Sequence, residues 1–172
     1  RLYPQGALAA HVLGFANIDG HGVMGAEAAF DDRLMAQDAR GTPLPLSIDM
    51  RVQAALELEL ADAVTKLEAR GGAGVVLDVQ TGEVLGMTSL PTFNPNRVSA
   101  SAVQAQQNAV TLSVYELGST FKPLTVAAAI DAGVVTDMAR RYDASRPLSV
   151  GGFQIRDLHS SGRWMNVPEA LV

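Results

Sequence analysis

A serine and a lysine stand three residues apart in the segment Ser119-Thr120-Phe121-Lys122. Residues i and i+3 share one face of a helix, so this spacing brings a hydroxyl and an amine within hydrogen-bonding reach. A serine becomes a nucleophile when a neighbouring base takes its proton, and a lysine can serve when its own charge is suppressed. The spacing therefore indicates nucleophilic catalysis by Ser119 with Lys122 as the base.

The same segment also fits the start of an ordinary core helix. The chain has ten serines and two lysines, so a chance Ser-x-x-Lys match arises roughly one time in ten. Gly118 gives the backbone freedom before the helix, Ser119 can cap it, and Pro123 is tolerated only near a helix start. From these residues alone, catalysis and a capped core helix both remain open.

The longest regular element that could support this segment lies upstream. Ser47 or Asp49 can cap a helix that runs through about Arg70 and ends at Gly71-Gly72. Its apolar positions recur at helical spacing. They are Val52, Leu56, Leu60, Val64 and Leu67. Residues 73–79 and 83–89 then read as two strands joined by a tight turn.

The other segments predict shorter elements. Residues 1 to about 46 read as short elements and turns, residues 100–113 as helical, residues 119–132 as the helix that carries Ser119, and a last helix begins near Val167. Strands joined by a short turn must be antiparallel. The predicted fold class is therefore α+β, with helices packed against an antiparallel sheet.

Composition excludes several kinds of site. A net charge of −5 argues against a nucleic-acid surface, and the absence of cysteine excludes disulfides and thiolate chemistry. No apolar stretch is close to the length of a membrane span, which is about 18 residues or more. His11, His21 and His159 are too widely spaced to suggest a metal site, so we predict neither metal nor cofactor. The carboxylate pairs Asp31/Asp32 and Glu57/Glu59 are predicted to be solvated.

Tyr115-Glu116-Leu117-Gly118-Ser119-Thr120-Phe121-Lys122-Pro123 resembles the active-site segment of class B penicillin-binding proteins. These are D,D-transpeptidases that cross-link peptidoglycan. Further segments resemble the family in the same order along the chain. They are Arg1–Gly6, His11–Phe15, Gly25–Glu27 with Phe30-Asp31, Leu46–Gln53, Asp78–Leu85, Phe93–Asn96 and Arg163–Glu169. The opening and closing segments are most similar to the septal, FtsI-type branch, with an elongation-type paralogue as the alternative.

The resemblance implies a chemistry for the motif. Ser119 would attack the carbonyl between the two terminal D-alanines of a stem peptide and form an acyl-enzyme, with Lys122 as the base. The backbone N–H of Ser119 would supply half of an oxyanion hole. β-Lactams would acylate the same serine. The resemblance implies no cofactor and no metal.

The resemblance also implies an organisation and a location. Residues 1–46 are predicted to be a pedestal segment, and residues 47–172 the N-terminal part of the transpeptidase domain. The chain reaches neither the Ser-x-Asn nor the Lys-Thr-Gly motif of the family, so we expect a fragment whose own activity is absent or very slow. Relatives are anchored in the inner membrane, act in the periplasm and bind division proteins, including a membrane-embedded glycan polymerase. A non-catalytic interaction module built on residues 1–46, and a β-lactam sensor or β-lactamase, remain the other hypotheses.

Overall fold

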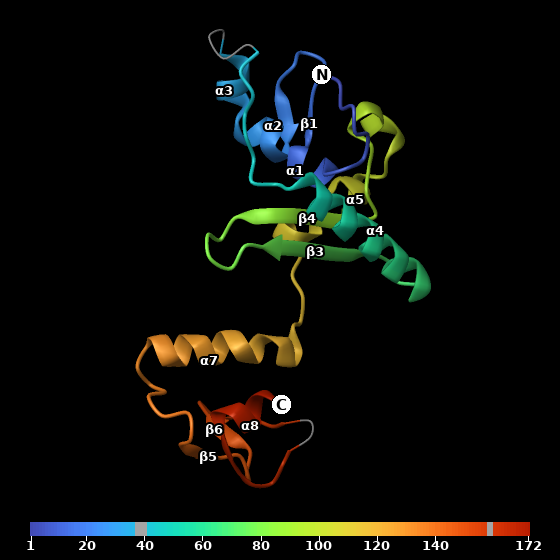
Figure 1. Ribbon diagram of the computed structural model, residues 1–172. Helices are drawn as coiled ribbons and strands as arrows, with labels where there is room; N and C mark the ends of the chain where they lie inside the picture. The colour runs from blue at the N-terminus through green and yellow to red at the C-terminus, as the bar shows by residue number, and fades with distance from the viewer. Residues whose placement is uncertain (37–40, 158–159) are drawn as a thin grey trace. The chain divides into compact units, whose positions relative to one another are not determined.

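The computed structural model describes residues 1–36, 41–157 and 160–172 and divides into two compact units, Arg1–Val114 and Tyr115–Val172. Figure 1 shows the helices and strands of each unit. The boundary proposed between residues 46 and 47 stays a prediction.

The first unit opens with short elements and continues with one long helix and a hairpin. Its elements are α1 (Ala10–Leu13), β1 (Phe15–Ala16), β2 (Gly22–Met24), α2 (Gly25–Ala29), α3 (Asp31–Met35), α4 (Met50–Lys66), β3 (Gly72–Leu77), β4 (Val84–Leu90), η2 (Pro95–Ala100), α5 (Val103–Gln106) and α6 (Ala109–Leu112). The short elements before residue 46 are as predicted. The helix predicted over 100–113 is instead two short helices, because Gln107 and Asn108 between them have extended backbone.

Helix α4 is the predicted helix, with its cap at Asp49. The Asp49 carboxylate accepts a hydrogen bond from the Arg51 N–H at 2.8 Å, which satisfies one of the free donors of the first turn. The helix ends at Lys66, four residues before the predicted end. Glu68 has a φ of 49°, outside the right-handed helical region, and the Ala69 N–H closes the last turn on the Val64 carbonyl at 3.0 Å.

Strands β3 and β4 form the predicted antiparallel hairpin, with Gly74 opposite Thr88. Helix α4 packs on one face of it. A Cβ added to Gly74 would lie 3.0 Å from the Leu56 side chain, so glycine in the strand lets the helix approach closely. Leu56, Leu60 and Val64 contact this face as predicted. Leu67 is 77% exposed, because the helix ends before it.

A buried polar side chain fastens α4 to the hairpin. Gln53 has 0% exposure; its Nε2 donates to the Met87 carbonyl at 2.9 Å, and its Oε1 accepts from the Met87 N–H at 2.8 Å. The amide thus pairs with β4 as a neighbouring strand would. Gln53 Nε2 also donates to the Glu57 carboxylate at 2.7 Å, and the same Glu57 oxygen accepts from the Ala9 N–H at 2.7 Å. One network therefore joins α4, β4 and the residues before α1.

The apolar core of the first unit is centred on Phe93, which is 2% exposed. The His11 and Phe15 rings meet it edge-on, with ring centroids 5.2 and 6.1 Å away. Ala10 and Ala105 complete the buried cluster. Residues before position 46 and residues after position 92 therefore share one core.

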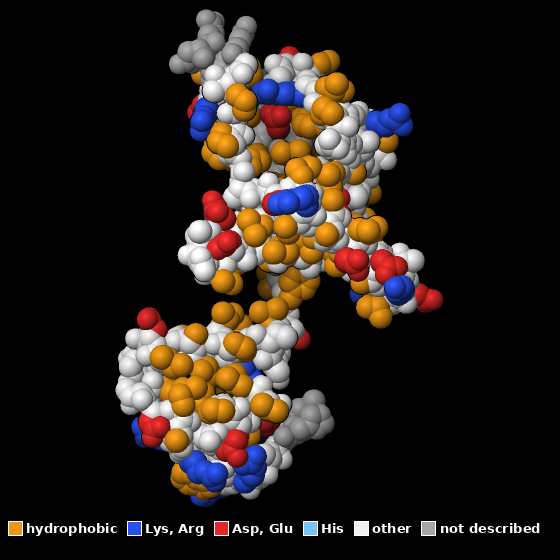
Figure 2. Space-filling model, in the orientation of Figure 1, with side chains coloured by type: hydrophobic (Ala, Val, Ile, Leu, Met, Phe, Trp, Pro, Cys, Tyr) orange, Lys and Arg blue, Asp and Glu red, His pale blue; other side chains and the backbone are white. Residues whose placement is uncertain are grey.

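The second unit contains one longer helix and two small sheets (Figure 1). Its elements are η3 (Gly118–Phe121), α7 (Lys122–Asp131), β5 (Arg141–Asp143), β6 (Leu148–Val150), β7 (Phe153–Ile155), β8 (Trp164–Asn166) and α8 (Val167–Leu171). Strand β5 pairs with β8 and β6 with β7, both antiparallel. Among the described residues of this unit, Val167 is the one buried hydrophobic residue, at 6% exposure. Figure 2 shows hydrophobic side chains gathered on the visible face of this unit.

Replacement of Gln53 by alanine is expected to destabilise the first unit by about 2–4 kcal/mol, because the part-buried N–H and carbonyl of Met87 lose their partner. Urea unfolding followed by circular dichroism measures the cost, and hydrogen exchange of the Met87 amide should accelerate. Gln104→Ala, an exposed residue of α5, is the matched control and should stay within about 0.5 kcal/mol of the parent. An equal effect of the two substitutions would contradict this role of Gln53.

Candidate active site

Ser119 and Lys122 lie at the junction between η3 and α7. Gly118 begins η3 with a φ of +55°, a conformation in which glycine is favoured. Pro123 lies in the first turn of α7, as predicted. The prediction that Ser119 caps the helix is wrong. The tight turn already starts at Gly118, so Ser119 lies inside it, and no side chain caps η3 or α7.

The two side chains line one pocket of about 550 Å³. In a 3-10 turn, residues i and i+3 lie above one another, so the turn keeps Ser119 and Lys122 on one side of the chain. The remaining wall comes from α7, β5, β8, α8 and the adjoining loops. Its residues are Val126, Tyr142, Ala144, Asp157, Ser161, Met165, Asn166, Val167, Glu169, Ala170 and Val172.

The Lys122 amine is bound to the backbone of α8. Its Nζ donates to the Ala170 carbonyl at 3.1 Å. Within the described parts of the chain, the Ser119 hydroxyl makes no hydrogen bond to Lys122. The roles of Ser119 as nucleophile and Lys122 as base therefore stay predictions, and the structure adds Ala170 as the partner of the amine.

Helix α8 starts with a reciprocal cap that the sequence analysis did not identify. The Asn166 side chain accepts from the Glu169 N–H at 2.9 Å, and the Glu169 carboxylate accepts from the Asn166 N–H at 2.9 Å. Arg163 donates to the other Glu169 oxygen at 2.7 Å. The Asn166 N–H, and then Arg163, hold the pKa of Glu169 below its usual value. The Asn-x-x-Glu spacing with Pro168 in the first turn was the available signal.

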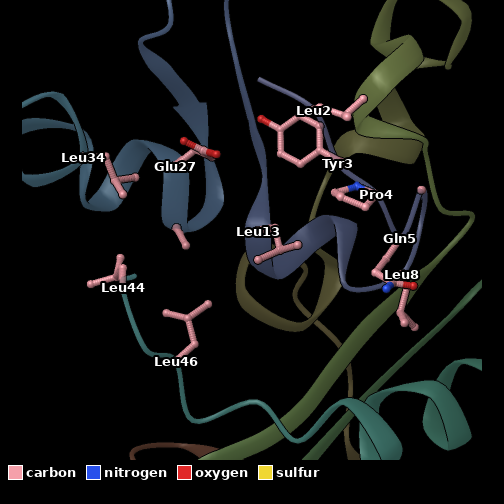
Figure 3. Close-up of a pocket in the computed structure, with 12 residues that line it drawn as sticks. Leu2, Tyr3, Pro4, Gln5, Leu8, Leu13, Glu27, Leu34, Leu44 and Leu46 are labelled. Atoms are coloured by element: carbon pink, nitrogen blue, oxygen red, sulfur yellow. The ribbon is translucent and has the colours of Figure 1, made fainter. Parts of the chain in front are cut away.

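A second pocket, of about 330 Å³, lies wholly within residues 1–46 (Figure 3). Half of its lining residues are leucines. Its wall consists of Leu2, Tyr3, Pro4, Gln5, Gly6, Leu8, Leu13, Ala26, Glu27, Leu34, Leu44 and Leu46. Arg1 Nε lies 3.2 Å from the Glu27 carboxylate, and the Tyr3 hydroxyl accepts from the Ala16 N–H at 2.8 Å. Burial raises the pKa of Tyr3. The pocket is therefore an apolar hollow with polar groups of Tyr3 and Glu27 in its wall.

The histidines have other partners than a metal. His11 Nε2 donates to the Ala105 carbonyl at 2.8 Å, and the His21 ring bonds the Asp31 carboxylate at 2.8 Å. Within the described residues, no group of three potential metal ligands comes together; His159 lies outside them. The solvated position predicted for Glu59 is confirmed, but Asp31 and Glu57 instead accept hydrogen bonds from the backbone of other segments.

The fold and the first pocket define an α+β protein with a Ser-x-x-Lys site. Residues 72–171 match the model of the penicillin-binding protein transpeptidase domain. The chain therefore belongs to the penicillin-binding protein transpeptidase family. Among the helices that the structure describes, none is long and apolar enough to cross a membrane.

The chain is also similar to individual proteins described as peptidoglycan D,D-transpeptidases. It is 44% identical over 99% of its length to a protein of Caulobacter vibrioides described as a probable peptidoglycan D,D-transpeptidase FtsI, and 36% identical over 92% to the peptidoglycan D,D-transpeptidase FtsI of Escherichia coli. It spans 29% and 30% of the lengths of these two relatives. A crystal structure of a peptidoglycan synthetase from Bifidobacterium adolescentis shares the fold, with a TM-score of 0.75 and 22% identity, over 98% of this chain and 36% of that one. The predicted α+β class and family are confirmed.

The pKa values of His11 and His21 are shifted in opposite directions. Burial lowers the pKa of His11, which is 4% exposed, whereas the hydrogen bond that the His21 ring donates to the Asp31 carboxylate raises the pKa of His21. The stability contributed by neutral His11 is present above its unfolded pKa of about 6.5 and is lost as the pH falls below it. The stability that charged His21 contributes is present below its unfolded pKa of about 6.5 and is lost as the pH rises through its higher folded pKa.

The free energy of unfolding should therefore be measured between pH 7.5 and 5. It should fall less toward acid in His11→Gln than in the parent. Glutamine is chosen because its amide can still donate to the Ala105 carbonyl. His21→Gln is the matched control and should make the loss toward acid larger. Identical profiles for the parent and His11→Gln would contradict the assignment.

Proposed function

We propose that this chain contributes the serine nucleophile and its lysine to a peptidoglycan D,D-transpeptidase of the septal, FtsI type. The observation that carries the proposal is the position of Ser119 and Lys122 on one pocket wall at the start of α7. The family and the FtsI relatives support the reaction class.

The reaction proceeds through an ester on Ser119. The Ser119 oxygen attacks the carbonyl carbon between the two terminal D-alanines of a stem peptide, and the Lys122 amine takes the hydroxyl proton. The C–N bond then breaks, and the leaving D-alanine amine takes a proton from Lys122. The amine of a second stem peptide attacks the ester and restores the serine. A β-lactam carbonyl enters the same first step, but its leaving nitrogen stays attached to the acyl group.

The contact with Ala170 suits this use of the lysine. The Ala170 carbonyl accepts one hydrogen of the amine and so holds Nζ beside the pocket that Ser119 also lines. The start of η3 also presents backbone N–H groups that lack an intrahelical acceptor, and the Ser119 N–H would bind the developing oxyanion.

A second candidate function is the binding of a partner by residues 1–46, which we propose as a pedestal before the transpeptidase part at residues 47–172. The leucine-lined pocket of this segment favours it. In the septal setting, the partners would be division proteins, including the membrane-embedded glycan polymerase. The protein would act in the periplasm, anchored to the inner membrane.

Incubation with benzylpenicillin should add one acyl group to the full-length product of the gene, as seen by intact mass. Ser119→Ala should remove the adduct, and Lys122→Ala should slow its formation by about two to four orders of magnitude, the range of general-base catalysis. Ser149→Ala, on exposed strand β6, is the matched control and should acylate at the parental rate. No adduct on the parent, or an adduct on Ser119→Ala, would refute the catalytic proposal.

The partner-binding role is tested by the affinity of the purified protein for the division-associated glycan polymerase. The double substitution Leu2→Ser and Leu46→Ser should weaken binding at least about tenfold, because both side chains line the pocket. Ile18→Ser, in the exposed turn between β1 and β2, removes a similar apolar side chain outside the pocket and serves as the control. Equal affinities for all three proteins would contradict this role.

A further inference from the structure

The amine of Lys122 depends on a segment distant in sequence. The acceptor that holds it, the Ala170 carbonyl, lies 48 residues away in α8. A carbonyl is held in place only by the path of its backbone. The position of the amine is therefore tied to whatever fixes the start of α8.

The first turn of α8 is held by hydrogen bonds of Asn166, Glu169 and Arg163. Asn166, the last residue of β8, and Glu169 satisfy each other's backbone N–H groups at 2.9 Å, which is a complete capping box. Arg163, just before β8, bonds the same carboxylate at 2.7 Å. Val167, the first residue of α8, is buried.

These parts adjoin the candidate site directly. Asn166, Glu169 and Ala170 line the same pocket as Ser119 and Lys122. A cap that only stabilised a surface helix would have no reason to affect the amine. Here the residue after Glu169 carries the acceptor for Lys122.

We propose that the Asn166–Glu169 capping box is a positioning device for Lys122, because it fixes the turn that presents the Ala170 carbonyl to the amine. The inference rests on the proposed function, since the position of Lys122 matters to catalysis only if this amine takes the proton of Ser119. Asn166 is a positioning residue and need not touch the substrate. The Glu169 carboxylate accepts hydrogen bonds from the Asn166 N–H and from Arg163, and these bonds lower its pKa.

The lysine signals provide a direct test. The chain has two lysines, so a sample labelled with 13C and 15N in lysine gives two side-chain signals. Lys66, ion-paired with Asp62 in α4, is the internal reference. Substitution of each lysine by arginine assigns the two signals.

Three variants separate positioning from general destabilisation. Asn166→Ala removes the cap and should shift the Lys122 signal while the Lys66 signal stays in place. Asn166→Ser retains a capping oxygen and should return the Lys122 signal toward the parental position. Asn94→Ala removes an equivalent asparagine cap, that of η2, and should leave the Lys122 signal unchanged.

Acylation of the full-length product by benzylpenicillin supplies the functional readout. Asn166→Ala should lower its rate about tenfold to a hundredfold, and Asn166→Ser should recover most of the loss. A Lys122 signal unchanged in Asn166→Ala, or a serine variant that behaves like the alanine variant, would overturn the inference. If the parent forms no adduct, the proposed function fails, and the lysine signals still decide whether the capping box positions Lys122.

Discussion

The first unit depends on one buried amide. Gln53 binds both backbone groups of Met87, and through Glu57 it reaches the backbone of Ala9. Without this amide, a part-buried donor and a part-buried acceptor of β4 would lose their partner, at a cost of up to about 1–3 kcal/mol for each group. The network therefore sets where α4 lies on the hairpin, and where the residues before α1 lie on α4.

The sequence predicted the elements that this network joins, but not the network. Helical spacing located α4, and two apolar runs around a turn located the hairpin, because burial of one face imposes a period on a sequence. A single glutamine in such a pattern reads as a surface residue. Its burial depends on the β4 backbone, 34 residues away, which no local pattern reports. Glu57 was misjudged for the same reason, whereas Leu67 was misplaced because the helix ends where Glu68 takes a left-handed conformation.

The candidate site likewise combines features that a local sequence pattern predicts with a contact that it does not predict. The spacing of Ser119 and Lys122, the glycine before them and the proline after them are local, and the structure keeps all of these features at the start of α7. The acceptor of the lysine is not local, since Ala170 carries no side-chain signal. The capping box of α8 was within reach of sequence reasoning, because its Asn-x-x-Glu spacing and the proline of its first turn are contiguous.

Both units thus attach a polar side chain to the main chain of a remote segment, Gln53 to Met87 and Lys122 to Ala170. Such a contact constrains the side-chain partner strictly, but constrains the backbone partner only through the path of its main chain, because nearly every residue has the same N–H and carbonyl groups. A short motif can therefore identify the family although the geometry that the motif requires is built elsewhere. Substitutions at the two ends of such a contact should therefore differ in kind. The position of the polar side chain tolerates few other residues, whereas the backbone partner responds to changes in the residues that fix the path of its main chain. For Lys122, those residues are Asn166 and Glu169.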